Sequence, residues 1–210
     1  MGAEVTSQDT QSAQTAPDQA EAGSFALTFG PREAELVRHL YAESRAVLEY
    51  GSGGSTVLAA TLGKPVVSVE SDKAWADRMS QTLAAHPIAS VHYADIGPTK
   101  AWGFPDGAEA AGRYHTYPLT VWDRPGLVAP DLVLIDGRFR AACLVATMLR
   151  TAEPVTVLFD DYLKRSYYHR VEALATLERM VGRMAVFTVT PGQIPPDMLT
   201  ETIGWFADPR

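Results

Sequence analysis

Apolar and polar positions follow two different rhythms along this chain. Short, nearly continuous apolar runs are typical of strands buried on both faces of a parallel sheet. Each run is followed by a longer stretch with apolar residues every three or four positions, the spacing of an amphipathic helix. The apolar runs fall at residues 46–50, 66–70, 88–95, 131–136 and 155–159. This alternation predicts an α/β domain with a mostly parallel sheet and helices on both faces.

The helical stretches carry start and stop signals of their own. Pro31 suits the first turn of a helix, and Ser71 and Asp72 offer an N-cap. Gly63 and Pro65 break the chain between one helix and the next strand. We therefore predict helices at residues 31–41, 54–62, 72–85, 139–150 and 167–181.

The end of the chain departs from strict alternation. Two further apolar runs, at residues 185–190 and 203–207, flank a proline-rich loop at residues 191–196. A loop of that size between consecutive strands suits an antiparallel pair at the edge of a sheet. The prediction is thus a seven-stranded sheet, mostly parallel, with an antiparallel edge strand.

Two segments do not fit the repeating pattern. Residues 1–23 have almost no large apolar side chains, so we expect a disordered N-terminal tail followed by a single domain at residues 24–210. Residues 96–129 are rich in Gly, Pro and aromatic residues and interrupt the strand–helix alternation as an insertion. The insertion is interpreted either as a lid or substrate wall, or as a cover for the sheet edge; the sequence leaves both open.

Composition narrows the possible partners. The chain has 210 residues, a net charge of −7 and one cysteine, Cys143. Binding to a nucleic-acid backbone needs a basic surface, so no nucleic-acid partner is expected and a small-molecule substrate is favoured. No apolar run approaches the roughly 20 residues of a membrane span, so no membrane partner is expected. We expect a soluble cytoplasmic protein of undetermined oligomeric state.

Acidic residues stand at the carboxyl ends of the predicted strands. In a parallel sheet these ends share one edge, so the side chains should converge on one crevice. Any one of them could instead cap the following helix. Together they call for a ligand with cationic or hydroxylated groups, or for a metal. The residues are Glu49, Glu70, Asp95, Asp136, Asp160 and Asp161.

A glycine turn follows the first of these strands. Gly51 and Gly53 fit part of the Gly-x-Gly-x-x-Gly pattern for dinucleotides, but Thr56 holds the last glycine position. Glu49 would also place negative charge near a pyrophosphate. A nicotinamide-dependent oxidoreductase therefore remains the less favoured alternative.

The segment Glu49-Tyr50-Gly51-Ser52-Gly53 resembles the acid-x-Gly-x-Gly first motif of class I S-adenosylmethionine-dependent methyltransferases. The resemblance extends from about residue 46 to residue 161 and implies their three-layer Rossmann-like fold. It differs at Ser55, where many members have a third glycine. The cofactor-binding residues that it implies are Gly51, Ser52, Gly53, Gly54 and Ser55 for the methionine portion, Glu49 for the amine, Glu70 with Ser71 for the ribose, Asp95 and Ile96 for adenine, and Asp136.

A second resemblance concerns the ends of the fourth and fifth strands. The segments Leu-Ile-Asp-Gly and Phe-Asp-Asp-Tyr look like the acid positions of metal-dependent O-methyltransferases. This resemblance implies catalytic roles for Asp136, Asp160 and Asp161, with Mg²⁺ as a candidate cofactor, since three oxygen donors suit that ion. Arg138 could pair with these acids instead, so metal use stays open.

The combined prediction is methyl transfer from S-adenosylmethionine to a small-molecule acceptor, with oxygen favoured over nitrogen as the nucleophile. A methyltransferase-like protein that binds adenosyl ligands without catalysis is the alternative from another class. The sequence does not identify the acceptor.

Overall fold

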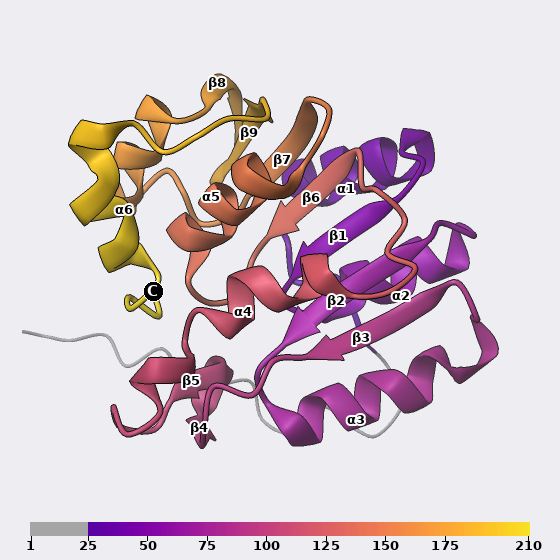
Figure 1. The fold of residues 1–210 in the computed structure, drawn as a ribbon. Helices are drawn as coiled ribbons and strands as arrows, with labels where there is room; N and C mark the ends of the chain where they lie inside the picture. Colours follow the sequence, from indigo (N-terminus) through magenta and orange to yellow (C-terminus); the bar gives the residue numbers. More distant parts are fainter. Residues whose placement is uncertain (1–24) are drawn as a thin grey trace, which may run out of the picture.

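The computed structural model describes residues 25–210, whose centre is a seven-stranded sheet (Figure 1). The strand order is β3-β2-β1-β6-β7-β9-β8, and the first five of these strands are parallel. β9 runs antiparallel to both of its neighbours, β7 and β8. The predicted α/β class, strand number and antiparallel edge are confirmed. The strands are β1 (Val47–Tyr50), β2 (Val66–Glu70), β3 (Ala89–Tyr93), β6 (Leu132–Ile135), β7 (Val155–Phe159), β8 (Thr176–Val181) and β9 (Met184–Val189).

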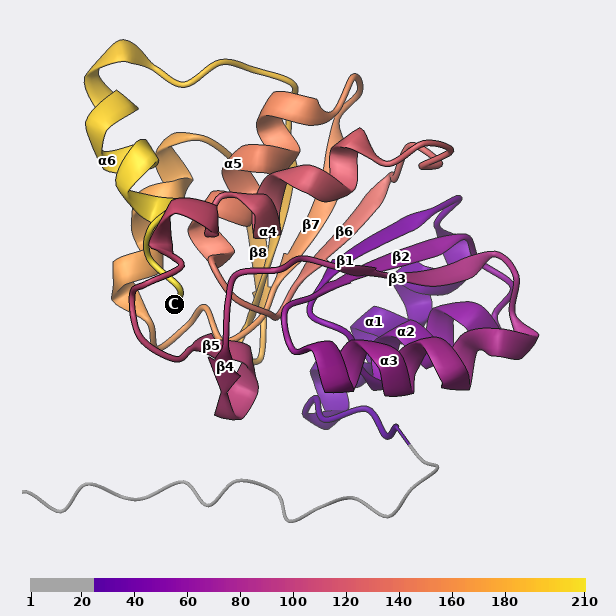
Figure 2. The same ribbon diagram turned by 60° about the horizontal axis from the view of Figure 1, so that its bottom comes forward.

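Helices cover both faces of the sheet and give the three layers predicted. Figure 2 shows α1, α2 and α3 beneath one face and α4, α5 and α6 on the other side. The helices are α1 (Pro31–Glu43), α2 (Gly54–Thr61), α3 (Lys73–Thr82), α4 (Thr116–Leu119), α5 (Arg140–Arg150) and α6 (Leu199–Trp205). Short 3₁₀ helices lie at Leu83–Ala85, Ala101–Gly103, Ala111–Arg113, Thr120–Asp123, Ser166–Ala173 and Pro196–Met198. None of the helices in residues 25–210 is long and apolar enough to cross a membrane.

Strand β1 shows how the sheet separates two cores. Val47 packs with residues of α1 and α2, whereas Leu48 and Tyr50 pack with residues of α4 and α5. Successive side chains of a strand point to opposite faces, so a strand between two helical layers must be apolar at nearly every position. Full burial of a side chain such as Leu48 contributes about 1.5–3 kcal/mol.

Two predicted elements near the end of the chain are wrong. The helix expected at residues 167–181 is a 3₁₀ helix followed by β8, and the strand expected at residues 203–207 is the end of α6 and the turn after it. The edge strand β8 has mostly exposed or half-buried side chains and a bulge between Leu177 and Arg179, which breaks the two-residue alternation. The antiparallel pair is therefore the hairpin β8–β9, and the proline-rich loop leads to a helix.

The insertion at residues 96–129 folds into short elements, including the hairpin of β4 (Thr99–Lys100) and β5 (Phe104–Pro105). Its aromatic side chains contribute to the core, since the Tyr117 ring lies 6.1 Å from that of Tyr50 and 5.6 Å from that of Phe139. This packing lies against β1, inside the sheet, and the two interpretations of the insertion, as a lid or substrate wall and as a cover for the sheet edge, stay predictions. The predicted tail at residues 1–23 lies outside the described residues.

Candidate functional site

The glycine turn connects β1 to α2 and contacts the turn after β6. Gly51 has a φ of +102°, a conformation that favours glycine. A Cβ atom at Gly51 would lie only 2.9 Å from the backbone nitrogen of Gly137. Gly53 differs, because nothing lies within 4 Å of the position its Cβ would take. The turns after β1 and β6 therefore meet through main chain alone, while Gly53 borders open space.

Glu49 lies beneath this turn and is fully buried. Its carboxylate accepts a hydrogen bond of 2.6 Å from the Tyr41 hydroxyl and a second one from the Thr56 hydroxyl. The backbone N–H of Gly53 donates to that same Thr56 hydroxyl at 3.1 Å. Burial raises the pKa of Glu49 to about 7, although the hydrogen bonds from Thr56 and Tyr41 act in the opposite direction. A cationic amine above the turn would thus meet Glu49 through Thr56, or after Thr56 has rotated.

Glu70 ends β2 and faces the glycine turn. One carboxylate oxygen accepts from the backbone N–H groups of Ser71 at 2.8 Å and Asp72 at 3.0 Å. The other oxygen accepts from the Ser52 hydroxyl at 3.0 Å. Burial raises the pKa of Glu70, and these hydrogen bonds counteract it. The carboxylate is consequently fixed in orientation. Within residues 25–210 its only hydroxyl donor is Ser52, whose side chain can rotate away.

Part of the insertion lies against the same carboxylate. Ser71 donates a hydrogen bond of 3.1 Å to the backbone oxygen of Gly103. A Cβ atom at Gly103 would lie 2.9 Å from the Ser71 hydroxyl and 3.6 Å from Glu70. Trp102, just before it, has a left-handed φ of +65°, which is uncommon for a bulky residue. The segment of Ala101–Gly103 is therefore in close contact with the end of β2.

The N-terminal end of the described chain reaches the turn from the other side. A Cβ atom at Gly54 would lie 2.7 Å from the backbone nitrogen of Leu27. The Phe25 ring packs edge-on against Trp75, with centroids 5.1 Å apart, and the Trp75 indole donates to the backbone oxygen of Ser52 at 2.9 Å. Residues 25–27 thus pack on the first turn of α2, where Ser55 is buried.

A cavity of about 410 Å³ opens beside the ends of β2 and β3. Asp95 lines it, accepts from the backbone N–H of Gly97 at 3.0 Å and pairs with Arg113. The side chain of Ile96 is fully buried in the core, so only its main chain can face a ligand. The lining residues are Ser71, Asp72, Lys73, Ala74, Tyr93, Asp95, Gly97, Pro98, Thr99 and Arg113.

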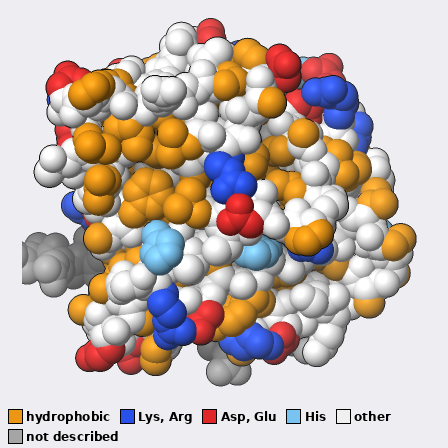
Figure 3. Space-filling view, viewed as in Figure 1, with side chains coloured by type: hydrophobic (Ala, Val, Ile, Leu, Met, Phe, Trp, Pro, Cys, Tyr) orange, Lys and Arg blue, Asp and Glu red, His pale blue; other side chains and the backbone are white. Residues whose placement is uncertain are grey.

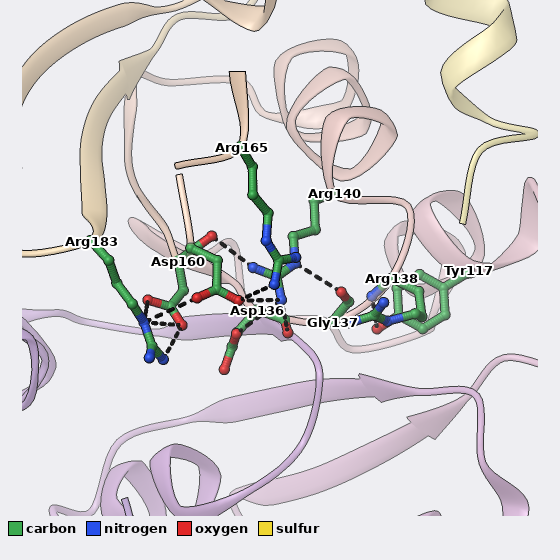
Figure 4. Close-up of polar contacts among 9 residues, drawn as sticks. Tyr117, Asp136, Gly137, Arg138, Arg140, Asp160, Arg165 and Arg183 are labelled. Atoms are coloured by element: carbon green, nitrogen blue, oxygen red, sulfur yellow. Dashed lines mark hydrogen bonds and ion pairs between the residues drawn. The ribbon is translucent and has the colours of Figure 1, made fainter. Parts of the chain in front are cut away.

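Asp136, Asp160 and Asp161 meet at the ends of β6 and β7, as the sequence predicted. Carboxylate oxygens of the three lie within 4.8 Å of one another. Figure 4 shows the guanidinium groups of Arg140, Arg165 and Arg183 around Asp136 and Asp160. Arg183 donates hydrogen bonds to both carboxylate oxygens of Asp160, the shortest being 2.7 Å. Arg165 donates one of 2.7 Å to the carboxylate of Asp161.

Arg140 ties the same strand ends together. It is 2% exposed and donates to the backbone oxygens of Gly137 at 3.0 Å, Asp160 at 2.7 Å and Asp136 at 2.9 Å. Its guanidinium also lies 3.3 Å from the Asp136 carboxylate and 3.6 Å from that of Asp161. Three carboxylates are thus balanced by three arginines, and the cluster joins β6, β7 and the β8–β9 hairpin.

The arginines shift the pKa values of Asp136 and Asp160 to different extents, so the two acids differ in charge near neutral pH. Burial raises the pKa of Asp136 to about 7, with Arg140 opposing the shift and Asp160 adding to it. Burial acts in the same direction on Asp160, but the hydrogen bonds and charge of Arg183 outweigh it and lower the pKa. Asp160 is therefore held ionised, whereas Asp136 can take up a proton near neutral pH.

These residues do not fit a divalent cation as they stand. Mg²⁺ requires about six oxygen ligands in octahedral geometry, several of them usually water. Here guanidinium groups contact all three carboxylates, and three positive charges already compensate them. The donor set is that of an ion-pair cluster.

Arg138, the arginine that the sequence offered as a candidate partner of these acids, does not pair with them. Arg138 forms no ion pair among residues 25–210, and its guanidinium lies over the Phe104 ring, 4.0 Å from the centroid. The true partners within the same segments, Arg140 and Arg165, stand four residues after Asp136 and Asp161. Arg183 comes from the β8–β9 turn, which no local spacing could have identified.

No continuous basic patch covers the face drawn in Figure 3, where Lys and Arg side chains lie dispersed among acidic and apolar ones. The dispersed basic side chains on this face are in keeping with the acidic net charge of −7.

Comparison with known proteins gives a clear structural relationship. No family model and no curated protein matches the sequence. Among solved structures, the chain is similar to a methyltransferase-like protein from Silicibacter pomeroyi, with 48% identity and a TM-score of 0.84, over 88% of this chain and 98% of that chain. It is also similar in fold to a methyltransferase from Geobacter sulfurreducens, with 12% identity and a TM-score of 0.51, over 77% and 80% of the two chains.

Proposed function

The chain belongs to the class I S-adenosylmethionine-dependent methyltransferase family, and from that premise we propose that it transfers a methyl group from S-adenosylmethionine to an oxygen of a small-molecule acceptor. The observation that carries the proposal is the position of Glu70. Its fixed carboxylate lies between the glycine turn and a cavity of about 410 Å³.

The residues around Glu70 fit the parts of the cofactor. A ribose diol needs a hydrogen-bond acceptor, and Glu70 offers one once the Ser52 hydroxyl rotates away. The cavity beyond Ser71, lined by Tyr93 and Asp95, would receive the adenine, which needs a flat contact and polar groups at its edge. The methionine portion would lie on the turn, near Gly53.

The ends of β6 and β7 would hold the acceptor. Methyl transfer requires in-line positioning of the nucleophile, the methyl group and the sulfur, more than strong acid–base chemistry. With a pKa of about 7, Asp136 is suited to accept the proton of an acceptor hydroxyl as the oxygen attacks. Arg140 would keep that carboxylate in place, while Asp160 and Asp161, held by Arg183 and Arg165, favour its uptake of the proton. No step is assigned to a metal.

A small molecule is favoured as the acceptor over a nucleic acid. The net charge of −7 opposes binding to a phosphate backbone, and the face drawn in Figure 3 has no continuous basic patch.

Calorimetric titration with S-adenosylhomocysteine tests the donor assignment. We expect the wild type to bind it and to bind NAD far more weakly. Glu70→Gln should weaken binding about tenfold or more, because a charged hydrogen bond to a ribose hydroxyl is lost. Glu153→Gln is the control, since Glu153 is exposed and remote from the turn. Tight NAD binding, or no binding of S-adenosylhomocysteine, would refute the proposal.

Catalysis is tested separately with S-adenosylmethionine carrying a tritiated methyl group and a panel of small hydroxylated acids and phenols. Transfer of label to a panel member is the expected result. Binding without transfer to any of them would favour the alternative of an adenosyl-ligand-binding protein without catalysis.

A further inference from the structure

Arg138 is a buried cation that forms no ion pair within the described chain. It follows Gly137 directly after β6 and is only 8% exposed. Its Nε atom is fully buried and has no hydrogen-bond partner among residues 25–210. No carboxylate of the same residues lies within ion-pair distance of its guanidinium. Buried arginines are ordinarily paired, so this one is an exception with a cost to folding.

The neighbouring Arg140 is fully paired, so the lack of partners is particular to Arg138. Arg140 is buried to a similar degree, yet it donates to three backbone oxygens and contacts two carboxylates. Arg165 and Arg183 engage the remaining carboxylate oxygens of the cluster. All three nearby acids are therefore already engaged, and none remains for Arg138.

Other unused donors stand close to Arg138. Figure 4 shows the Tyr117 side chain beside it. The Tyr117 hydroxyl accepts from the backbone N–H of Arg138 at 3.3 Å and donates to no group of the described chain. The Tyr168 hydroxyl is buried and has no partner within residues 25–210. Burial and Arg140 lower the pKa of Arg138, while Tyr117, Tyr168 and Asp136 oppose that change.

The Phe104 ring completes the surroundings. It stacks on the guanidinium with 4.0 Å between centroid and Cζ, which leaves the edge of the guanidinium plane for hydrogen bonds. A flat guanidinium with free N–H groups is suited to a carboxylate, which it can bind through two parallel hydrogen bonds.

We propose that Arg138 binds a carboxylate group of the ligands that occupy this site, with the Tyr117 and Tyr168 hydroxyls as further donors. The inference rests on the proposed function and adds the chemical class of a ligand group. Two sources carry this chemistry: the amino-acid end of the cofactor, which would lie nearby because Gly137 contacts Gly51, and a carboxylate on the acceptor.

Binding measurements on full-length protein distinguish the two sources. The probes are S-adenosylhomocysteine, 5′-methylthioadenosine (which lacks the carboxylate) and benzoate as an acidic acceptor analogue. The variants are Arg138→Gln, Arg138→Lys and, as a matched control, Arg38→Gln at an exposed position of α1.

If the cofactor supplies the carboxylate, Arg138→Gln weakens S-adenosylhomocysteine binding about tenfold to hundredfold and leaves 5′-methylthioadenosine unchanged. If the acceptor supplies it, Arg138→Gln leaves both nucleosides unchanged and weakens benzoate by a similar factor. Arg138→Lys should retain part of the affinity in either case. Equal affinities of wild type and Arg138→Gln for all three probes, or no benzoate binding to the wild type with unchanged nucleoside affinities in the variant, would overturn the inference.

Stability separates a binding role from a structural one. An unpaired buried charge lowers stability, so Arg138→Met should raise the ligand-free melting temperature, by about 2–4 °C. A lowered melting temperature would mean that Arg138 serves the fold through its stacking on Phe104, and would also overturn the inference. Failure of the wild type to bind S-adenosylhomocysteine would instead refute the proposed function.

Discussion

Replacing Glu49 by Gln should make the stability of this protein less dependent on pH. Glu49 is fully buried, and burial raises its pKa from 4.5 to about 7 in the folded state. Gln imitates the protonated carboxyl in size and polarity and cannot ionise. The wild type and Glu49→Gln should therefore be similar at low pH and differ at high pH.

The magnitude follows from the difference between the two pKa values. Between pH 4.5 and pH 7 the unfolded chain releases the Glu49 proton while the folded chain keeps it. The free energy of unfolding of the wild type therefore falls as pH rises through this window and levels off above pH 7. A difference of 2.5 pKa units corresponds to about 3 kcal/mol. By pH 8 Glu49→Gln should have gained this amount relative to the wild type.

Urea unfolding at pH 5, 6, 7 and 8 measures the difference, with Glu153→Gln as the exposed control. A difference between wild type and Glu49→Gln that stays constant from pH 5 to pH 8 would refute the reasoning. It would mean that the hydrogen bonds from Tyr41 and Thr56 keep Glu49 ionised in the folded protein despite its burial.

Ionisation of Glu49 should also make the affinity for the cofactor depend on pH. If ionised Glu49 attracts the ligand amine, the affinity of the wild type for S-adenosylhomocysteine should rise by up to about tenfold per pH unit below pH 7 and then level off. Glu49→Gln should show no such rise. Parallel pH profiles for the two proteins would show that the amine is bound elsewhere.

Three further predictions concern the strand ends. Arg140→Met should lower the free energy of unfolding, measured with urea, by about 1–3 kcal/mol, because it leaves the backbone oxygens of Gly137, Asp136 and Asp160 without their side-chain donor and the half-buried Asp136 carboxylate without its ion-pair partner; a variant as stable as the wild type would contradict the role of Arg140 in joining β6 to β7. Adding Mg²⁺ or a chelator should change neither the melting temperature nor the affinity for S-adenosylhomocysteine, and a metal-dependent rise in either would contradict the ion-pair interpretation. Gly51→Ala should lower the melting temperature, since its Cβ would meet Gly137, whereas Gly53→Ala should fold normally and lose ligand affinity; equal stability of the two variants, followed by thermal melting, would count against this contact.

The part of the fold that the sequence predicts is the part that depends on local pattern. β1, β2, β6 and β7 are nearly continuous apolar runs because helices cover both of their faces, and such runs can be recognised without a structure. β8 is an exposed edge strand whose pairing with β9 includes a bulge, so its own sequence carries little strand signal. Its conformation depends on a partner strand rather than on its own apolar pattern.

The candidate site likewise has one feature that the sequence predicts and one that it does not. Parallel topology brings strand ends to one edge, so the gathering of Asp136, Asp160 and Asp161 could be predicted. Their pairing could not, because Arg183 reaches Asp160 from a turn in the region where the predicted elements were wrong. Charge compensation of this kind depends on tertiary distances, and it decides whether a group of acids suits a metal or an ion-pair cluster.

The contact between Gly51 and Gly137 limits how this site can be redesigned. The turns after β1 and β6 touch through backbone atoms. Neither glycine has a side chain that a substitution could shorten, and a larger side chain at either position would clash with the opposite turn. Changing the acceptor range by directed evolution would have to act through residues around these two turns that are not part of the core, such as the half-buried Phe104. A mutant library should therefore hold positions 51 and 137 as glycine and diversify exposed positions of the insertion, such as Trp102, while keeping Tyr117, whose ring packs on Tyr50 of β1.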